Sequence, residues 1–220
     1  MKKTGSENFN FIRAFHWIFA ASVLLLLASG FQISFPLVEA LWPTSRTRLI
    51  HLVMSSVLVF SLIFRLYYAV MHRSYYNFII RKSDLKTVIP LLKSHLFISS
   101  EPRSLLPKYD IGQKFFQLSW FIGVVLQTIT GLVMLNPGRF TLLVSLVGDL
   151  QTFRFIHFLV ALWFLFTAAV HIYLSITEDP LRVSALLIGE KRPFVNKKEA
   201  KYSLLLFIKK IKRLLLKIRV

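Results

Sequence analysis

Four long apolar stretches dominate the pattern of hydrophobic and polar positions along this chain. Three of them contain no charged residue between their flanking charges, and the fourth contains only Arg65. A helix of about 20 apolar residues is long enough to cross the hydrocarbon core of a bilayer. The pattern therefore predicts an all-α membrane protein, a bundle of four transmembrane helices with spans near 13–35, 49–71, 114–135 and 153–175.

The composition agrees with this prediction. Hydrophobic residues make up 55% of the 220 positions and charged residues only 17%, whereas a water-soluble domain carries about 25% charged residues. The sequence contains no cysteine, which excludes disulfides, thiolate-held iron–sulfur clusters and covalently attached c-type haem. Any metal or cofactor is therefore held by histidine, carboxylate or thioether groups.

Positive charge is distributed unevenly about the four spans. Lys and Arg number 28 against 10 Asp and Glu. Of these basic residues, 23 fall on one side of the membrane and four on the other, with Arg65 between them. Because cytoplasmic segments are enriched in Lys and Arg, we expect both termini to be cytoplasmic in a bacterial inner membrane. Membrane orientation accounts for the excess of Lys and Arg, so this excess does not indicate a nucleic-acid partner, and none is expected.

The chain divides into a membrane domain over residues 1–180 and a basic tail over residues 181–220. Between Ser203 and Val220, apolar residues recur at helical spacing and Lys or Arg fill most of the remaining positions. This pattern predicts an amphipathic helix that lies on the anionic lipid of the inner leaflet. Docking on a cytoplasmic partner is the alternative.

Four of the six histidines lie inside the predicted spans, where an ionisable residue indicates a functional site. The direction of each helix places His51 and His157 near the outer surface (the outer pair), and His16 and His171 near the cytoplasmic side (the inner pair). Each pair offers two imidazoles at matching depth on different helices, as bis-histidine ligation of one haem requires, and imidazole is a good ligand for iron. Without cysteine the haem is non-covalent, so the pattern predicts two b-type haems.

Other interpretations of these histidines stay open. Any single one can instead form a hydrogen bond to a neighbouring helix. Zinc or copper is a second alternative, although such a site would normally gather three or four ligands at one depth. A small transporter that uses intramembrane histidines as proton carriers is a third.

Arginines occur beside the histidines and are candidates to bind haem propionates. Arg65 lies fourteen residues after His51, so it shares that helix face and reaches the depth of the inner pair. A buried arginine needs an anionic partner, which a propionate provides; snorkelling to the interface is the alternative. Arg13, Arg48 and Arg154 each lie one turn before a histidine and equally serve as ordinary charges at the ends of spans.

Small residues inside the spans indicate where helix backbones or a porphyrin approach closely. They are Gly30, Gly123 and Gly131, together with Ser55, Ser56 and Ser119.

Several short motifs around these residues resemble a known family. They are R-A-F-H-W at 13–17, R-L-I-H at 48–51, R-L-Y at 65–67, K-Y-D-I-G-Q-K at 108–114, T-G-L at 130–132, R-F-I-H at 154–157 and H-I-Y at 171–173. Together they resemble the bacterial cytochrome b561 and nickel–iron-hydrogenase b-type cytochrome superfamily. That group includes the gamma subunit of formate dehydrogenase and the cytochrome b of thiosulfate reductase.

The resemblance implies a membrane anchor that passes electrons between a partner's iron–sulfur subunit on the periplasmic face and the quinone pool. In formate dehydrogenase gamma subunits, the residues that match Asp110, Gly112 and His171 border the quinone. This chain has Asp110 where that motif usually has Asn, which changes the hydrogen bonds offered to a quinone. Tyr109 and Gln113 add polar groups at the same point. An ordinary helix N-terminus capped by Asp110 is the alternative.

The sequence therefore predicts a dihaem b-type cytochrome, an electron-transfer subunit of a respiratory oxidoreductase rather than a catalytic subunit. The main alternative is a stand-alone b561-like quinol oxidase that passes electrons to a small periplasmic acceptor, such as superoxide or a soluble cytochrome.

Overall fold

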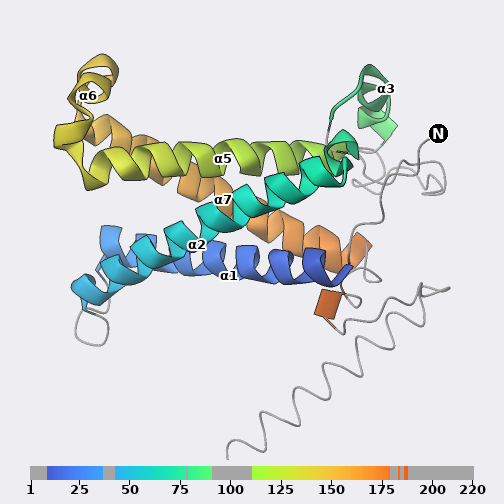
Figure 1. The fold of residues 1–220 in the computed structure, drawn as a ribbon, viewed down its shortest axis with the longest axis horizontal. Helices are drawn as coiled ribbons and strands as arrows, with labels where there is room; N and C mark the ends of the chain where they lie inside the picture. Colours follow the sequence, from blue (N-terminus) through green and yellow to red (C-terminus); the bar gives the residue numbers. More distant parts are fainter. Residues whose placement is uncertain are drawn as a thin grey trace, which may run out of the picture. The chain divides into compact units, whose positions relative to one another are not determined.

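The computed structural model of the protein describes residues 9–36, 43–77, 79–90, 111–178, 183 and 186–187. These residues form helices and turns, and no strand occurs among them. The elements in chain order are α1 (Phe9–Ser34), α2 (Thr44–Met71), η1 (Ser74–Asn77), α3 (Lys82–Leu85), α5 (Ile111–Leu135), η3 (Pro137–Arg139), α6 (Thr141–Val147) and α7 (Leu150–Glu178) (Figure 1).

Four of these helices, α1, α2, α5 and α7, are long and apolar enough to cross a membrane. The predicted all-α membrane fold is therefore confirmed. Each helix begins about one turn before its predicted span, because charges taken as boundaries, such as Arg48, Lys114 and Arg154, lie inside the first turns. Large apolar side chains remain exposed along all four, including Leu24, Phe60, Leu135 and Phe166, as expected for surfaces that face lipid.

The described residues divide into two units, the first taken from 18–164 and the second from 9–17 together with the described residues from 165 onward. The core of the first unit takes one buried residue from each long helix, namely Val23, Leu58, Val124 and Phe164. Trp120 of α5 joins this core, with its ring 5.8 Å from the ring of Phe19 and 5.4 Å from that of Phe164. All four helices therefore pack together within this unit.

Gly123 allows α5 to pack closely against α7 in this core. A Cβ atom at position 123 would lie 2.9 Å from Cε2 and Cζ of the Phe164 ring. Phe164 is itself buried in the core. The prediction that small residues in the spans permit close approach is confirmed here.

We expect Gly123→Ala to destabilise the protein by about 1–3 kcal/mol, the usual cost of inserting a methyl group into a filled core. The measurement is thermal unfolding of the purified protein in detergent. Gly138→Ala is the matched control, because a Cβ atom there meets nothing within 4 Å, and it should leave the unfolding temperature unchanged. Equal unfolding temperatures for Gly123→Ala and the wild type would contradict the packing described here.

A buried ion pair fixes the segment after α2 to the start of α5. Nζ of Lys114 lies 2.7 Å from Oδ2 of Asp84, and both side chains are more than nine-tenths buried. The same carboxylate oxygen accepts a hydrogen bond of 2.8 Å from the backbone N–H of Arg81. Lys114, counted above only as a cytoplasmic positive charge, is therefore also a structural residue.

These two donors give Asp84 a pH-dependent effect on stability. The hydrogen bond from Lys114, followed by that from the Arg81 N–H, lowers the pKa of Asp84. The ionised carboxylate therefore stabilises the folded state at neutral pH, and this contribution is lost as the pH falls from the ordinary value of about 4 through the lowered pKa. We expect the gap in unfolding temperature between the wild type and Asp84→Asn to be constant from about pH 8 to 5 and to close below about pH 4. A gap in unfolding temperature that stays constant over the whole pH range would contradict a stabilising role of the ionised Asp84.

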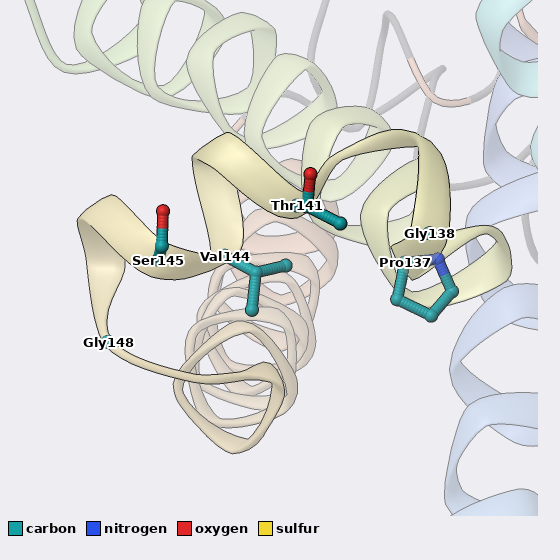
Figure 2. Close-up of a pocket in the computed structure, with 6 residues that line it drawn as sticks. All are labelled: Pro137, Gly138, Thr141, Val144, Ser145 and Gly148. Carbon is teal, nitrogen blue, oxygen red and sulfur yellow. The ribbon is translucent and has the colours of Figure 1, made fainter.

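The connection from α5 to α7 contains η3 and α6, and the sequence pattern did not predict the helix α6. An open hollow on this connection is lined by Pro137, Gly138, Thr141, Val144, Ser145 and Gly148 (Figure 2). None of these six residues is ionisable, so the lining offers no acid–base group. The intramembrane histidines are therefore the stronger candidates for the functional site.

Candidate functional site

The outer pair lies in the first unit, on two different helices. His51 belongs to α2 and His157 to α7, and their ring centroids are 6.3 Å apart with an interplanar angle of 52°. Nδ1 of His51 lies 2.8 Å from the hydroxyl oxygen of Ser29, and Nδ1 of His157 lies 2.8 Å from that of Thr130. The predicted association of these two histidines is therefore present in the fold.

Two glycines also lie against the outer pair. A Cβ atom at Gly30 would lie 3.4 Å from Cε1 of His51, and one at Gly131 would lie 3.7 Å from Cε1 of His157. Glycine thus brings the backbones of α1 and α5 next to the imidazoles. Both glycines belong to the set predicted from the sequence to allow close approach.

The inner pair lies in the second unit and has nearly the same ring geometry. The ring centroids of His16 and His171 are 6.3 Å apart, and the interplanar angle is 51°. Trp17 packs its ring edge-on to His16 at 5.4 Å. Its Nε1–H also donates a hydrogen bond of 3.2 Å to the backbone oxygen of Leu186.

The separation within each pair fits two imidazoles on opposite sides of one metal ion. Bonds of about 2.0–2.1 Å from a metal to each imidazole nitrogen place two opposed ring centres about 6 Å apart, and both pairs show 6.3 Å. Among the described residues, no cluster of three or more His, Asp or Glu side chains could hold a metal ion. Each pair thus presents two protein ligands, which suits a metal that brings its other ligands with it, as haem iron does.

A buried amide near the outer pair also suits a cofactor with carboxylates. Nε2 of Gln32 is buried and has no hydrogen-bond acceptor within the described part of the chain. Gln32 lies one turn beyond Ser29 on α1, on the same face of that helix. A haem propionate there would accept its N–H. Gln127 is a further intramembrane amide, and its Nε2 donates a hydrogen bond of 3.0 Å to the backbone oxygen of His157.

The arginines predicted as propionate partners differ in their surroundings. Arg65 is half-buried, and its Cζ lies 5.9 Å from the centre of the Tyr68 ring. Arg13 donates to the backbone oxygens of Leu186 at 2.7 Å and Leu187 at 3.0 Å, both within the second unit. Arg48 and Arg154 are exposed. Their roles toward propionates stay predictions.

The predicted quinone-binding segment is described only in part. α5 begins at Ile111, and Gly112 and Gln113 are half-buried in its first turn. Tyr109 and Asp110 lie outside the described residues, as do His95 and the tail beyond residue 187. The ligand and quinone-binding roles of all these residues stay predictions.

Three polar residues near the outer pair were missed by the sequence analysis, namely Ser29, Gln32 and Gln127, and Thr130 was noted there only as part of the T-G-L motif. Polar side chains inside spans are themselves a signal, because they need partners in an apolar environment. His72, one of the two histidines outside the predicted spans, is half-buried, and its ring stacks on that of Tyr68 at 4.0 Å.

Four apolar helices and two pairs of intramembrane histidines define a multi-pass membrane protein suited to a metal-containing cofactor. The prokaryotic cytochrome b561 family matches this chain over residues 10–188, and the chain belongs to that family. It is thus a membrane cytochrome b, an electron-transfer protein that carries haem b.

Curated relatives bear related names. The chain is 25% identical over 197 residues to a probable Ni/Fe-hydrogenase B-type cytochrome subunit of Azotobacter vinelandii, covering 80% of this chain and 82% of the relative. A protein of the same name from Cupriavidus necator is 24% identical over 189 residues, covering 76% and 77%. No solved structure matches the chain.

Proposed function

We propose that this protein is a dihaem cytochrome b that transfers electrons across the membrane between a partner redox subunit and the quinone pool. The observation that carries the proposal is the recurrence of one geometry. Two histidine pairs, in two separate units, both have ring centroids 6.3 Å apart. If each histidine only formed a hydrogen bond to a neighbouring helix, there would be no reason for both pairs to have the same ring separation.

In this proposal, His51 and His157 bind the outer haem and His16 and His171 bind the inner haem. Haem iron, when bound, supplies a one-electron carrier. The imidazoles would hold the cofactor, and the apolar helices around them would keep water away. Gln32 would orient the outer cofactor by donating its buried Nε2–H, and Arg13 and Arg65 are further cationic residues proposed to contact propionates.

The proposed partners follow from the family and from the names of the relatives. A periplasmic redox subunit with iron–sulfur clusters, of the kind that hydrogenases contain, exchanges electrons with the outer haem. Quinone exchanges electrons and protons with the protein near Tyr109, Asp110, Gly112 and Gln113, whose motif resembles the quinone-binding element of the formate dehydrogenase gamma subunit. Copurification of an iron–sulfur subunit distinguishes this function from that of a stand-alone quinol oxidase.

Haem quantitation tests the proposal directly. The pyridine haemochrome assay on purified protein, with the polypeptide measured by amino-acid analysis, should give about two haems b per chain, one for each histidine pair. One haem per chain, or no iron, would overturn the dihaem assignment.

We further propose that the protein lies in the bacterial inner membrane with both termini cytoplasmic, and that residues 181–220 form a tail bound to anionic lipid. A reporter that is active only in the cytoplasm, fused after Val220, should be active. The same fusion to a reporter active only in the periplasm should be silent, since 23 of the 28 Lys and Arg residues favour a cytoplasmic location. The reverse result would exchange the surfaces assigned to the two haems.

A further inference from the structure

We propose that Ser29 and Thr130 are positioning residues for the outer haem, each fixing the tautomer and orientation of one axial histidine. This inference rests on the proposed function, since it takes His51 and His157 as haem ligands. Its basis is a pair of matching contacts on different helices. Ser29 of α1 bonds to Nδ1 of His51, and Thr130 of α5 bonds to Nδ1 of His157, both at 2.8 Å.

The direction of these hydrogen bonds follows from the proposed ligation. Iron binding through Nε2 requires that nitrogen to keep its lone pair, so Nδ1 of each neutral imidazole carries the proton. A hydroxyl group has one proton to donate and can also accept. Ser29 donates its proton to the backbone oxygen of Leu25 at 2.7 Å, and Thr130 donates its own to that of Leu126 at 2.7 Å. Each hydroxyl oxygen therefore accepts the Nδ1–H of its histidine.

Burial strengthens both contacts. Ser29 is 6% exposed and Thr130 is 4% exposed, so both hydroxyl groups lie in an apolar interior shielded from bulk water. A hydrogen bond at low dielectric holds its partner more firmly than one at the surface. The hydrogen bond at Nδ1 therefore limits the rotation of each imidazole ring about its Cβ–Cγ bond.

The same two-residue arrangement occurs at both histidines. Ser29 is followed by Gly30 and Thr130 by Gly131, and each glycine lies beside Cε1 of the imidazole that the preceding hydroxyl binds. The hydroxyl holds the imidazole while the glycine leaves room for it. A contact that served only local helix packing would not be expected to recur at both ligands of one cofactor.

This arrangement has an electronic consequence. When the ring nitrogen that does not bind iron donates a hydrogen bond, the ligating histidine becomes more basic. A more basic ligand stabilises ferric over ferrous iron and lowers the reduction potential. Removing either hydroxyl should therefore raise the potential of the outer haem and leave that of the inner haem unchanged.

The experiment compares Ser29→Ala and Thr130→Val with the wild type in the full-length purified protein. The readouts are a redox titration of both haems, the low-spin ferric EPR signals and the haem content per chain. His51→Ala identifies which component belongs to the outer haem. We expect each substitution to shift the ferric/ferrous equilibrium of that haem by about three- to tenfold toward ferrous, which corresponds to about 30–60 mV for one electron, together with a changed EPR signal.

Matched controls separate positioning from helix packing. Ser22 and Thr128 also donate to carbonyl oxygens of their own helices, at 2.8 Å and 2.7 Å, so Ser22→Ala and Thr128→Val remove the same groups from α1 and α5. These controls should leave the outer haem unchanged, and Ser29→Thr and Thr130→Ser should restore its potential. Selective loss of the outer haem from Ser29→Ala or Thr130→Val would also support the inference.

Three results would count against it. Unchanged potential and EPR signals in both variants and in their double variant, with two haems present, would overturn the positioning role and leave the proposed function intact. The same would follow if the controls shifted the outer haem equally. A wild-type protein without two haems would instead overturn the proposed function itself.

Discussion

Replacing either member of the outer pair is expected to remove one of two haems and leave the other in place. His51→Ala or His157→Ala deletes one of the two axial ligands, whose rings are 6.3 Å apart, and a single imidazole does not hold a low-spin haem from both sides. The haem content of the purified protein should fall from about two to about one per chain. One component should disappear from the redox titration. His16→Ala and His171→Ala should remove the other component.

His72→Ala is the matched control for these substitutions. His72 is a histidine at the end of α2 that stacks on Tyr68 and belongs to neither pair, so its replacement should preserve both haems. The assignment of ligands to pairs would be wrong if His51→Ala and His16→Ala removed the same component.

Substitutions at the start of α5 are expected to slow electron exchange with quinone without disturbing either haem. Asp110→Ala and Gln113→Ala remove polar groups proposed to bind the quinone head and, for Asp110, to relay its protons. Loss of a hydrogen bond that involves a charged group costs about 1.5–3 kcal/mol, so we expect a decrease of about tenfold or more in quinone-linked turnover. The measurement compares turnover with a quinone analogue and with an artificial dye that accepts electrons elsewhere.

Gln117→Ala provides the control for these variants. Gln117 lies one turn further along α5 and is exposed, so its loss should affect neither activity. Equal decreases with dye and quinone, or unchanged quinone rates in both Asp110→Ala and Gln113→Ala, would move the quinone site away from this segment.

The sequence was sufficient to predict the four long helices, and it was less accurate for where they begin. A bilayer requires every backbone polar group in a span to be bonded internally, so a long apolar stretch has to be helical. The helices begin about one turn before the predicted spans because a first turn at the interface tolerates charges such as Lys114 and Arg154. The short helix α6 escaped prediction since seven residues in a connection carry too little periodic signal.

Helix direction and the rise per residue determined the depth of each histidine, and so the sequence by itself placed His51 with His157 and His16 with His171. Their roles as ligands stay predictions, although the structure brings both pairs of rings together. Depth along a span depends only on counting residues, which is why this part of the site could be predicted without knowledge of the packing.

Only the tertiary structure decided which side chains meet across helices. Ser29 contacts His51, Thr130 contacts His157, and Gly123 faces Phe164. Each contact depends on how far a helix is rotated about its axis. In a membrane protein the faces toward lipid and toward other helices are both apolar, as the many exposed Leu and Phe side chains show. The hydrophobic pattern therefore determines where each helix lies along the membrane normal and leaves its rotation to side-chain packing.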